Sequence, residues 1–179
     1  MTETTAPIVL PIVRPLSPAD VPPLGTHVTI TADAAQRAAL AEAAEAVSVE
    51  SLVAEFRIVP WSGEGFAVTG RVRADLTQTC VVTLEPIATT VDEAVDVKLV
   101  PPEEMAKYDI TPDENGEIDL DASVLDLPDP IEGGVIDLGA IACEYFMLGV
   151  DPYPRKPGAE FDAEALGVGD GRGKLSPFA

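Results

Sequence analysis

Two stretches of alternating residues, 52–58 and 66–74, restrict the fold of this chain more than any other feature. Leu52, Ala54, Phe56 and Ile58 stand at every second position of the first, and Phe66, Val68, Val72 and Ala74 at even positions of the second. This period of two is typical of strands with one buried face. Pairing Ile58 with Val68 buries all of these residues on one face, whereas a one-residue shift would set Arg71 against Phe56. The sequence therefore predicts an antiparallel hairpin in this register, with Gly63 or Gly65 at a positive φ in the loop.

Two more strands are expected after the hairpin. Residues 78–84 place Cys80, Val82 and Leu84 on one side and end at Glu85-Pro86. Residues 91–99 place Val91, Val95, Val97 and Leu99 inward, with Glu93 as the exception. Four strands joined by short connections predict an antiparallel meander with one solvated face. Residues 27–30 are also rich in β-formers, and an edge strand is expected near residues 8–14.

Two helices are expected to pack on this sheet. Asp33 and Gln36 have the spacing of a capping box before an alanine-rich helix, whose large apolar residues are Leu40 and Val47. A second helix follows Asp137, and its apolar stripe is Leu138, Ile141, Tyr145 and Leu148. Gly149 suits a left-handed cap, and the helix of about three turns needs a surface to dock on. We expect an α+β fold with a strongly twisted antiparallel sheet, open or curled toward a barrel, and two or three short helices.

Prolines and charge divide the chain into segments. Six prolines in residues 1–25 predict an extended arm, residues 26–161 form the domain with an acidic loop at 101–130, and the glycine-rich residues 162–179 predict a flexible tail. The first 25 residues have prolines within their apolar run and no basic start, so we expect neither a secretion signal nor a membrane helix. The expected location is the cytoplasm.

The net charge of −20 limits the partners of this chain. It repels phosphate backbones at long range, so nucleic-acid binding would need a local basic patch, and we expect neither DNA nor a membrane as partner. Residues 103–129 contain ten acidic residues and one basic residue, Lys107. Residues 112–121 place oxygens around a glycine, but Pro112, Ile118 and Leu120 interrupt the spacing of a calcium loop. A solvated acidic loop is the preferred interpretation.

The sequence has no motif for catalysis. The single histidine, His27, has no neighbour in sequence that would make it a base, and no nucleophile elbow or phosphate-binding loop is present. Cys80, expected within a strand, and Cys143, expected off the helix stripe, are interpreted as small packed hydrophobes. We expect no enzymatic activity, no metal and no cofactor.

Two groups of residues are candidates for contact with a partner. Arg57, Arg71 and Arg73 share the polar face of the hairpin, where they form an RNA-contacting patch or, alternatively, Arg71 pairs with Glu55 in an exposed ion pair. Tyr153, Arg155 and Lys156 lie among prolines. They form either a binding segment or a chain reversal that packs Tyr153 onto the sheet.

The stretches TCVVTLEP at 79–86, GEIDL at 116–120, IDLGAIACEYFMLGV at 136–150 and DPYPRKPG at 151–158 resemble the YceD family, in its alphaproteobacterial branch. The resemblance covers residues 29–161. It implies a non-enzymatic role in the accumulation and processing of large-subunit ribosomal RNA. Many members carry a CxxC where this chain has Cys80 and Thr83, so a thiol or metal role of that pair does not transfer.

Three interpretations of the function follow. The preferred one is a ribosome biogenesis factor that contacts large-subunit rRNA, directly or through a protein. The alternative is an acidic module that docks a basic ribosomal or assembly protein through residues 103–129 without touching RNA. A metal or redox role of Cys80 or the acidic loop is the third.

Overall fold

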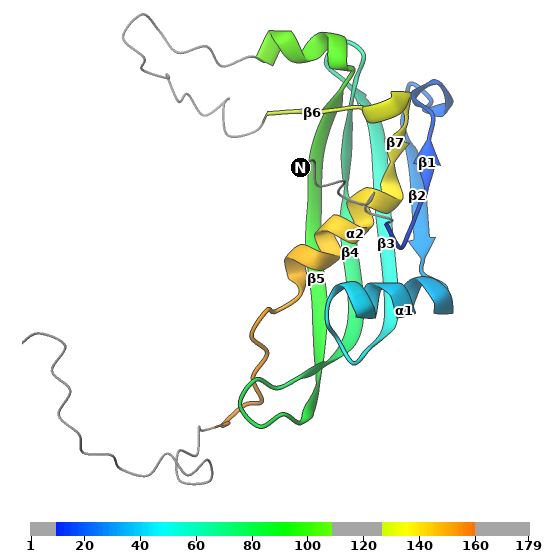
Figure 1. Cartoon of the computed structure of the whole chain (residues 1–179). Helices are drawn as coiled ribbons and strands as arrows, with labels where there is room; N and C mark the ends of the chain where they lie inside the picture. Colours follow the sequence, from blue (N-terminus) through cyan, green and yellow to red (C-terminus); the bar gives the residue numbers. More distant parts are fainter. Residues whose placement is uncertain (1–9, 109–126, 160–179) are drawn as a thin grey trace, which may run out of the picture.

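The computed structural model describes residues 10–108 and 127–159, and a five-stranded sheet with the order β2-β3-β4-β5-β6 lies at its centre (Figure 1). The strands are β2 Thr26–Thr31, β3 Ser48–Trp61, β4 Gly65–Thr79, β5 Pro86–Val100 and β6 Asp129–Pro130. β2 to β5 pair antiparallel, and β6 adds a short parallel pairing to β5. This confirms the α+β class and the antiparallel sheet. The sheet is open, so the barrel alternative is wrong.

The β3–β4 hairpin has the predicted register. Ile58 lies opposite Val68, Phe56 opposite Gly70 and Glu55 opposite Arg71. Gly63 takes the predicted positive φ, of 65°, in the loop. Gly70 is required for a different reason, because a Cβ atom there would stand 2.0 Å from the backbone oxygen of Glu55. Both strands are longer than the alternation indicated, since residues 48–51 pair with residues 75–77, and residues 78–79 continue the pairing of β4 with β5.

The strand predicted at residues 78–84 does not exist. β4 continues through Gln78 and Thr79, the chain then turns at residues 80–85, and β5 begins at Pro86. Leu84, at a φ of 59°, closes the turn. The prediction was wrong because the β-branched and apolar residues of this turn alternate as they would in a strand. The fourth antiparallel strand is instead β2, which pairs with β3 along its whole length.

Helices α1 (Ala34–Ala43) and α2 (Leu138–Gly149) both cover the same face of the sheet (Figure 1). The capping box of α1 is confirmed, since the Asp33 side chain accepts from the Gln36 N–H and Gln36 accepts from the Asp33 N–H, both at 2.9 Å. Leu40 is buried as expected. Val47 is not a contact of this helix, because α1 ends at Ala43 and the Val47 side chain is 60% exposed.

The buried face of α2 differs from the predicted stripe. Asp137 caps the helix by accepting from the N–H groups of Gly139 and Ala140, as expected. The buried residues are Leu138, Gly139, Ile141, Ala142, Cys143 and Phe146. Leu148 is 68% exposed, so the helix is rotated from the expected orientation and Cys143 lies inside the core. Its last residue, Gly149, is helical and not a left-handed cap; a Cβ there would meet Val91 Cγ1 at 2.6 Å.

The first described residues pack on the start of α2. The strand of this region is β1 (Pro15–Leu16), which begins just after the predicted residues 8–14 and pairs with β7 (Ile136–Asp137). The Arg14 N–H donates to Asp137 Oδ1 at 3.0 Å, and Ile12 is buried. The described residues also form the short 3-10 helices η1 Pro18–Asp20, η2 Pro102–Tyr108 and η4 Glu132–Gly134. Residues 1–9 of the predicted arm and the whole tail at 162–179 lie outside the described residues.

Candidate functional site

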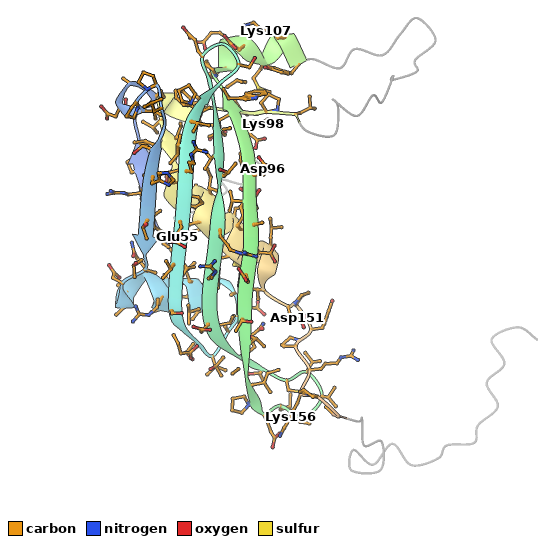
Figure 2. The ribbon with its side chains drawn as sticks, turned by 180° about the vertical axis from the view of Figure 1, so that it is seen from behind. Glu55, Asp96, Lys98, Lys107, Asp151 and Lys156 are labelled. Atoms are coloured by element: carbon orange, nitrogen blue, oxygen red, sulfur yellow. The ribbon has the colours of Figure 1, made fainter. Side chains whose placement is uncertain are left out.

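The face of the sheet opposite α1 and α2 carries the predicted arginines. Figure 2 shows this open face, and no described helix covers its strands β3, β4 and β5. Arg57, Arg71 and Arg73 are exposed and alternate with the buried residues of the hairpin. The structure therefore places the three side chains on one face, as the register required.

The positive charge of this face is largely neutralised. Arg71 pairs with Asp92 of β5 at 2.5 Å, and Arg73 lies between Glu55 at 3.3 Å and Asp92 at 3.5 Å. The expected pair of Arg71 with Glu55 is thus wrong, because the longer Arg71 side chain reaches across to β5 although Glu55 is its partner in the ladder. About half of each side chain is exposed, so each pair contributes less than about 1 kcal/mol. No concentrated positive patch results at Arg71 and Arg73.

A second group of side chains lies at one end of this face. Trp61 and Tyr108 stack with ring centroids 6.3 Å apart, and Lys98 Nζ lies 5.4 Å from the Trp61 ring centre. Sequence reasoning missed this group, because Tyr108 belongs to η2, which the acidic composition led us to interpret as loop. Trp61 thus contacts both an aromatic ring and a cation at the end of the β3–β4 hairpin.

The turn at 80–85 and the segment at 151–156 are fastened to one another, and we call them together the junction. The Val81 N–H donates to the Pro154 carbonyl at 2.9 Å, and Gln78 Nε2 donates to the Asp151 carbonyl at 2.9 Å. Lys156 Nζ contacts Glu85 Oε2 at 2.8 Å. Two stretches some 70 residues apart in sequence therefore form one structural unit.

Cys80 lies at the centre of the junction and is fully buried. Its sulfur accepts from the backbone N–H groups of Lys156 at 3.3 Å and Thr83 at 3.4 Å. Hydrogen bonding from the Thr83 side chain, followed by these two N–H groups, lowers the pKa of the Cys80 thiol to about 6. Cys80 is buried as expected, but its predicted place within a strand is wrong, and its sulfur also accepts the hydrogen bonds that join the two halves of the junction.

Tyr153, Arg155 and Lys156 come together at the surface of the junction. Tyr153 is 70% exposed, so the alternative in which its ring packs onto the sheet is wrong. The buried residue of this segment is Pro154, and the Tyr153 N–H donates to Asp151 Oδ1 at 2.9 Å. The ion pair with Glu85 raises the pKa of Lys156 and lowers the pKa of Glu85. The side chains of Tyr153 and Arg155 are thus exposed, and hydrogen bonds at Tyr153 and Pro154 hold the backbone of this segment in place.

The junction and the arginines of the open face are separate. Cys80 follows Arg73 by seven residues of extended chain, which is about 23 Å. Figure 2 shows Lys156 at one end of the molecule and Lys98 and Lys107 at the other. The six predicted contact residues therefore form two sites. Glu85 and Cys80 were missed as members of the second, because their turn was interpreted as a strand.

The acidic segment is described only at its ends. Glu103 and Glu104 lie in η2, and Glu104 pairs with Lys107 at 3.0 Å. Residues 109–126, which include the whole calcium-like pattern at 112–121, lie outside the described residues. Within the described part, no group of three or more His, Cys, Asp or Glu side chains is arranged to hold a metal ion. None of the helices in that part is long and apolar enough to cross a bilayer.

Comparison with curated proteins and with solved structures finds no significant match. One family model matches residues 68–173, a span that begins in β4 and includes both halves of the junction. The family is described as large ribosomal RNA subunit accumulation protein YceD. This match covers more than half of the 179 residues. Three of the four stretches of the resemblance lie within this match and consist entirely of described residues. The chain therefore belongs to the YceD family.

Proposed function

We propose that this protein supports the accumulation and processing of large-subunit ribosomal RNA as a non-enzymatic cytoplasmic factor that contacts the RNA through the junction. One observation carries the proposal. Both halves of the junction lie in the span matched by the family, and their mutual hydrogen bonds leave Tyr153 and Arg155 exposed side chains on a stiff backbone.

The two exposed side chains have complementary chemistry for RNA. A tyrosine ring stacks on an unpaired base, which contributes about 1–3 kcal/mol, and a guanidinium binds phosphate oxygens in a forked geometry. Because Lys156 is paired with Glu85, it contributes less positive charge to RNA binding than Arg155 does. Because only one or two phosphates are contacted, the affinity should fall with salt along a shallow log–log slope of about −0.7 to −1.4.

The second candidate is the docking of a basic ribosomal or assembly protein. The pairing of Arg71 and Arg73 with Asp92 and Glu55 favours it over RNA contact at the open face. In this candidate the acidic surface of a chain with a net charge of −20 supplies the attraction.

Complementation of depleted cells tests the proposal. Cells that lose the protein should lose the large-subunit peak in a sedimentation profile and accumulate rRNA precursors. The double variant Tyr153→Ala/Arg155→Glu should fail to restore the peak, and its purified form should bind precursor RNA at least tenfold more weakly. Arg71→Gln/Arg73→Gln is the matched control. It should restore the large-subunit peak, and its purified form should bind precursor RNA as the parent does.

Two outcomes would contradict the proposal. An unchanged sedimentation profile after depletion would remove the role in rRNA accumulation. A junction variant that restores the profile while the arginine control fails would move the contact to the open face.

A further inference from the structure

A groove runs between α1 and α2 on the covered side of the molecule. Its volume is about 670 Å³. Most of its walls come from Ala39, Leu40 and Ala43 of α1 and Ala140, Cys143 and Met147 of α2. Three of these six residues are alanines, whose short side chains leave the space between the helices unfilled. Met147 is 42% exposed although its neighbour Phe146 is fully buried.

The groove continues into a second hollow toward the junction. The hollow has a volume of about 400 Å³, shares Ala43 and Met147 with the groove, and ends at Val81 and Pro154. The ten residues of α1 span about 15 Å, which is just under three helical turns, and the second hollow lengthens the channel toward the junction. An apolar groove of this kind suits the apolar face of an amphipathic helix, which is one of the recurring modes of peptide recognition.

The rims of this channel are acidic. Glu42 of α1 and Glu144 of α2 line the groove from opposite sides, and both are exposed. Glu45 and Asp151 line the second hollow. Among the described residues, no lysine or arginine lines either space. We propose that the channel between α1 and α2 docks a basic amphipathic helix of a protein partner, whose apolar stripe fills the channel and whose flanking lysines or arginines meet Glu42 and Glu144.

Charge argues against a second copy of the chain as the occupant. A copy would bring the same glutamates to the same rims, and each copy carries a net charge of −20. The channel also lies on the side away from the open face, and neither Tyr153 nor Arg155 lines it, so the inference goes beyond the RNA contact and does not depend on it. The α1 wall precedes residue 68 and thus lies outside the span matched by the family.

The test uses the full chain and a synthetic helical peptide of about 18 residues, which spans about 27 Å as a helix. The peptide has leucines at i, i+3, i+4 and i+7, flanked by lysines, and carries a fluorophore for anisotropy. It should bind with a micromolar dissociation constant. The same peptide with glutamates in place of the lysines should bind at least tenfold more weakly.

Two variants of the protein locate the binding. Glu42→Lys/Glu144→Lys should weaken the basic peptide at least tenfold, whereas the control Asp20→Lys/Glu64→Lys, with the same change in net charge, should stay within about twofold. Ala43→Trp should fill the channel and abolish binding. Ala43 is an exposed residue in the last turn of α1, so the variant should keep the circular dichroism spectrum of the parent.

Several results would overturn the inference. The absence of binding, or equal loss in the control and the rim variant, would remove the site. A dimer in sedimentation velocity that Ala43→Trp dissociates would assign the channel to a second copy. Peptide binding that appears only after deletion of residues 1–9, which precede Leu10 at the end of the groove, would assign it to the chain's own N-terminal segment.

Discussion

At the scale of single residues, Cys80 shows how hydrogen bonding changes the chemistry of a buried side chain. Its sulfur accepts hydrogen bonds from backbone N–H groups in both halves of the junction, and the pKa of its thiol is lowered to about 6. Cys143 lies on the buried face of α2, where burial raises the pKa of its thiol. The two cysteines should therefore ionise at well-separated pH values.

Absorbance at 240 nm, which reports thiolate, should show one step near pH 6 in the folded protein, and Cys80→Ser should remove it. Because the folded-state pKa of Cys80 lies below its ordinary value of 9.0, the folded state loses the proton first. The free energy of unfolding should thus gain a contribution as pH rises from about 6 to 9 and lose it as pH falls through about 6. A first thiolate step at pH 9 or above would contradict the assignment.

Gly70 is the second residue with a specific requirement. A Cβ atom there would meet the Glu55 backbone oxygen at 2.0 Å, and no side-chain rotation can relieve a contact with backbone. Gly70→Ala should lower the free energy of unfolding by about 3 kcal/mol or more, because β3 and β4 must separate locally. Thr69→Ala, on the exposed side of the same strand, should cost no more than about 1 kcal/mol in urea denaturation. Equal effects of the two substitutions would disprove the close approach.

At the scale of secondary structure elements, the orientation of α2 is the feature most easily tested. Phe146 is fully buried and Leu148 is 68% exposed, the reverse of what the predicted stripe required for Leu148. Phe146→Ala should lower the free energy of unfolding by about 3–5 kcal/mol through the cavity it leaves. Leu148→Ala should change it by less than about 0.5 kcal/mol. A larger loss at Leu148, measured by chemical denaturation, would restore the predicted stripe.

The elements also show where sequence patterns suffice. The β3–β4 register followed from residues 52–74, because a one-residue shift would have set Arg71 against Phe56. The cap of α1 followed from Asp33 and Gln36, which are local partners. Residues 80–85 failed, since their alternation is that of a strand while Leu84 takes a positive φ that a leucine seldom adopts.

The candidate site was predicted only in part, for a related reason. Tyr153, Arg155 and Lys156 could be selected by composition, and they do lie at the surface. The attachment of Lys156 to Cys80 and Glu85 joins residues more than 70 positions apart, and no local pattern encodes such a pairing. The ion pair of Arg71 was likewise assigned to its ladder neighbour, although β5 offered Asp92 at closer range.

At the scale of the whole molecule, the net charge of −20 acts against compactness. Repulsion among acidic side chains destabilises the folded state, and salt screens it. Raising the salt from about 0.01 M to about 1 M shortens the Debye length from about 30 Å to about 3 Å and should raise the midpoint of thermal unfolding. The exposed ion pairs of Arg71 and Arg73 weaken over the same range but contribute less. A midpoint that falls with sodium chloride would show that attraction, not repulsion, dominates the surface.

The first described residues pack on α2, so they cannot reach their final contacts until α2 has been synthesised. A growing chain releases β2 to β5 first, and each pairing among them joins strands that are adjacent in sequence. Ile12 and the part of the sheet formed by β4 and β5 have no cover until α2, close to the last described residues, has been made. The nascent protein therefore displays part of its future core to the surroundings for most of its translation. The dense negative charge that weakens the finished fold keeps neighbouring nascent chains apart during this interval.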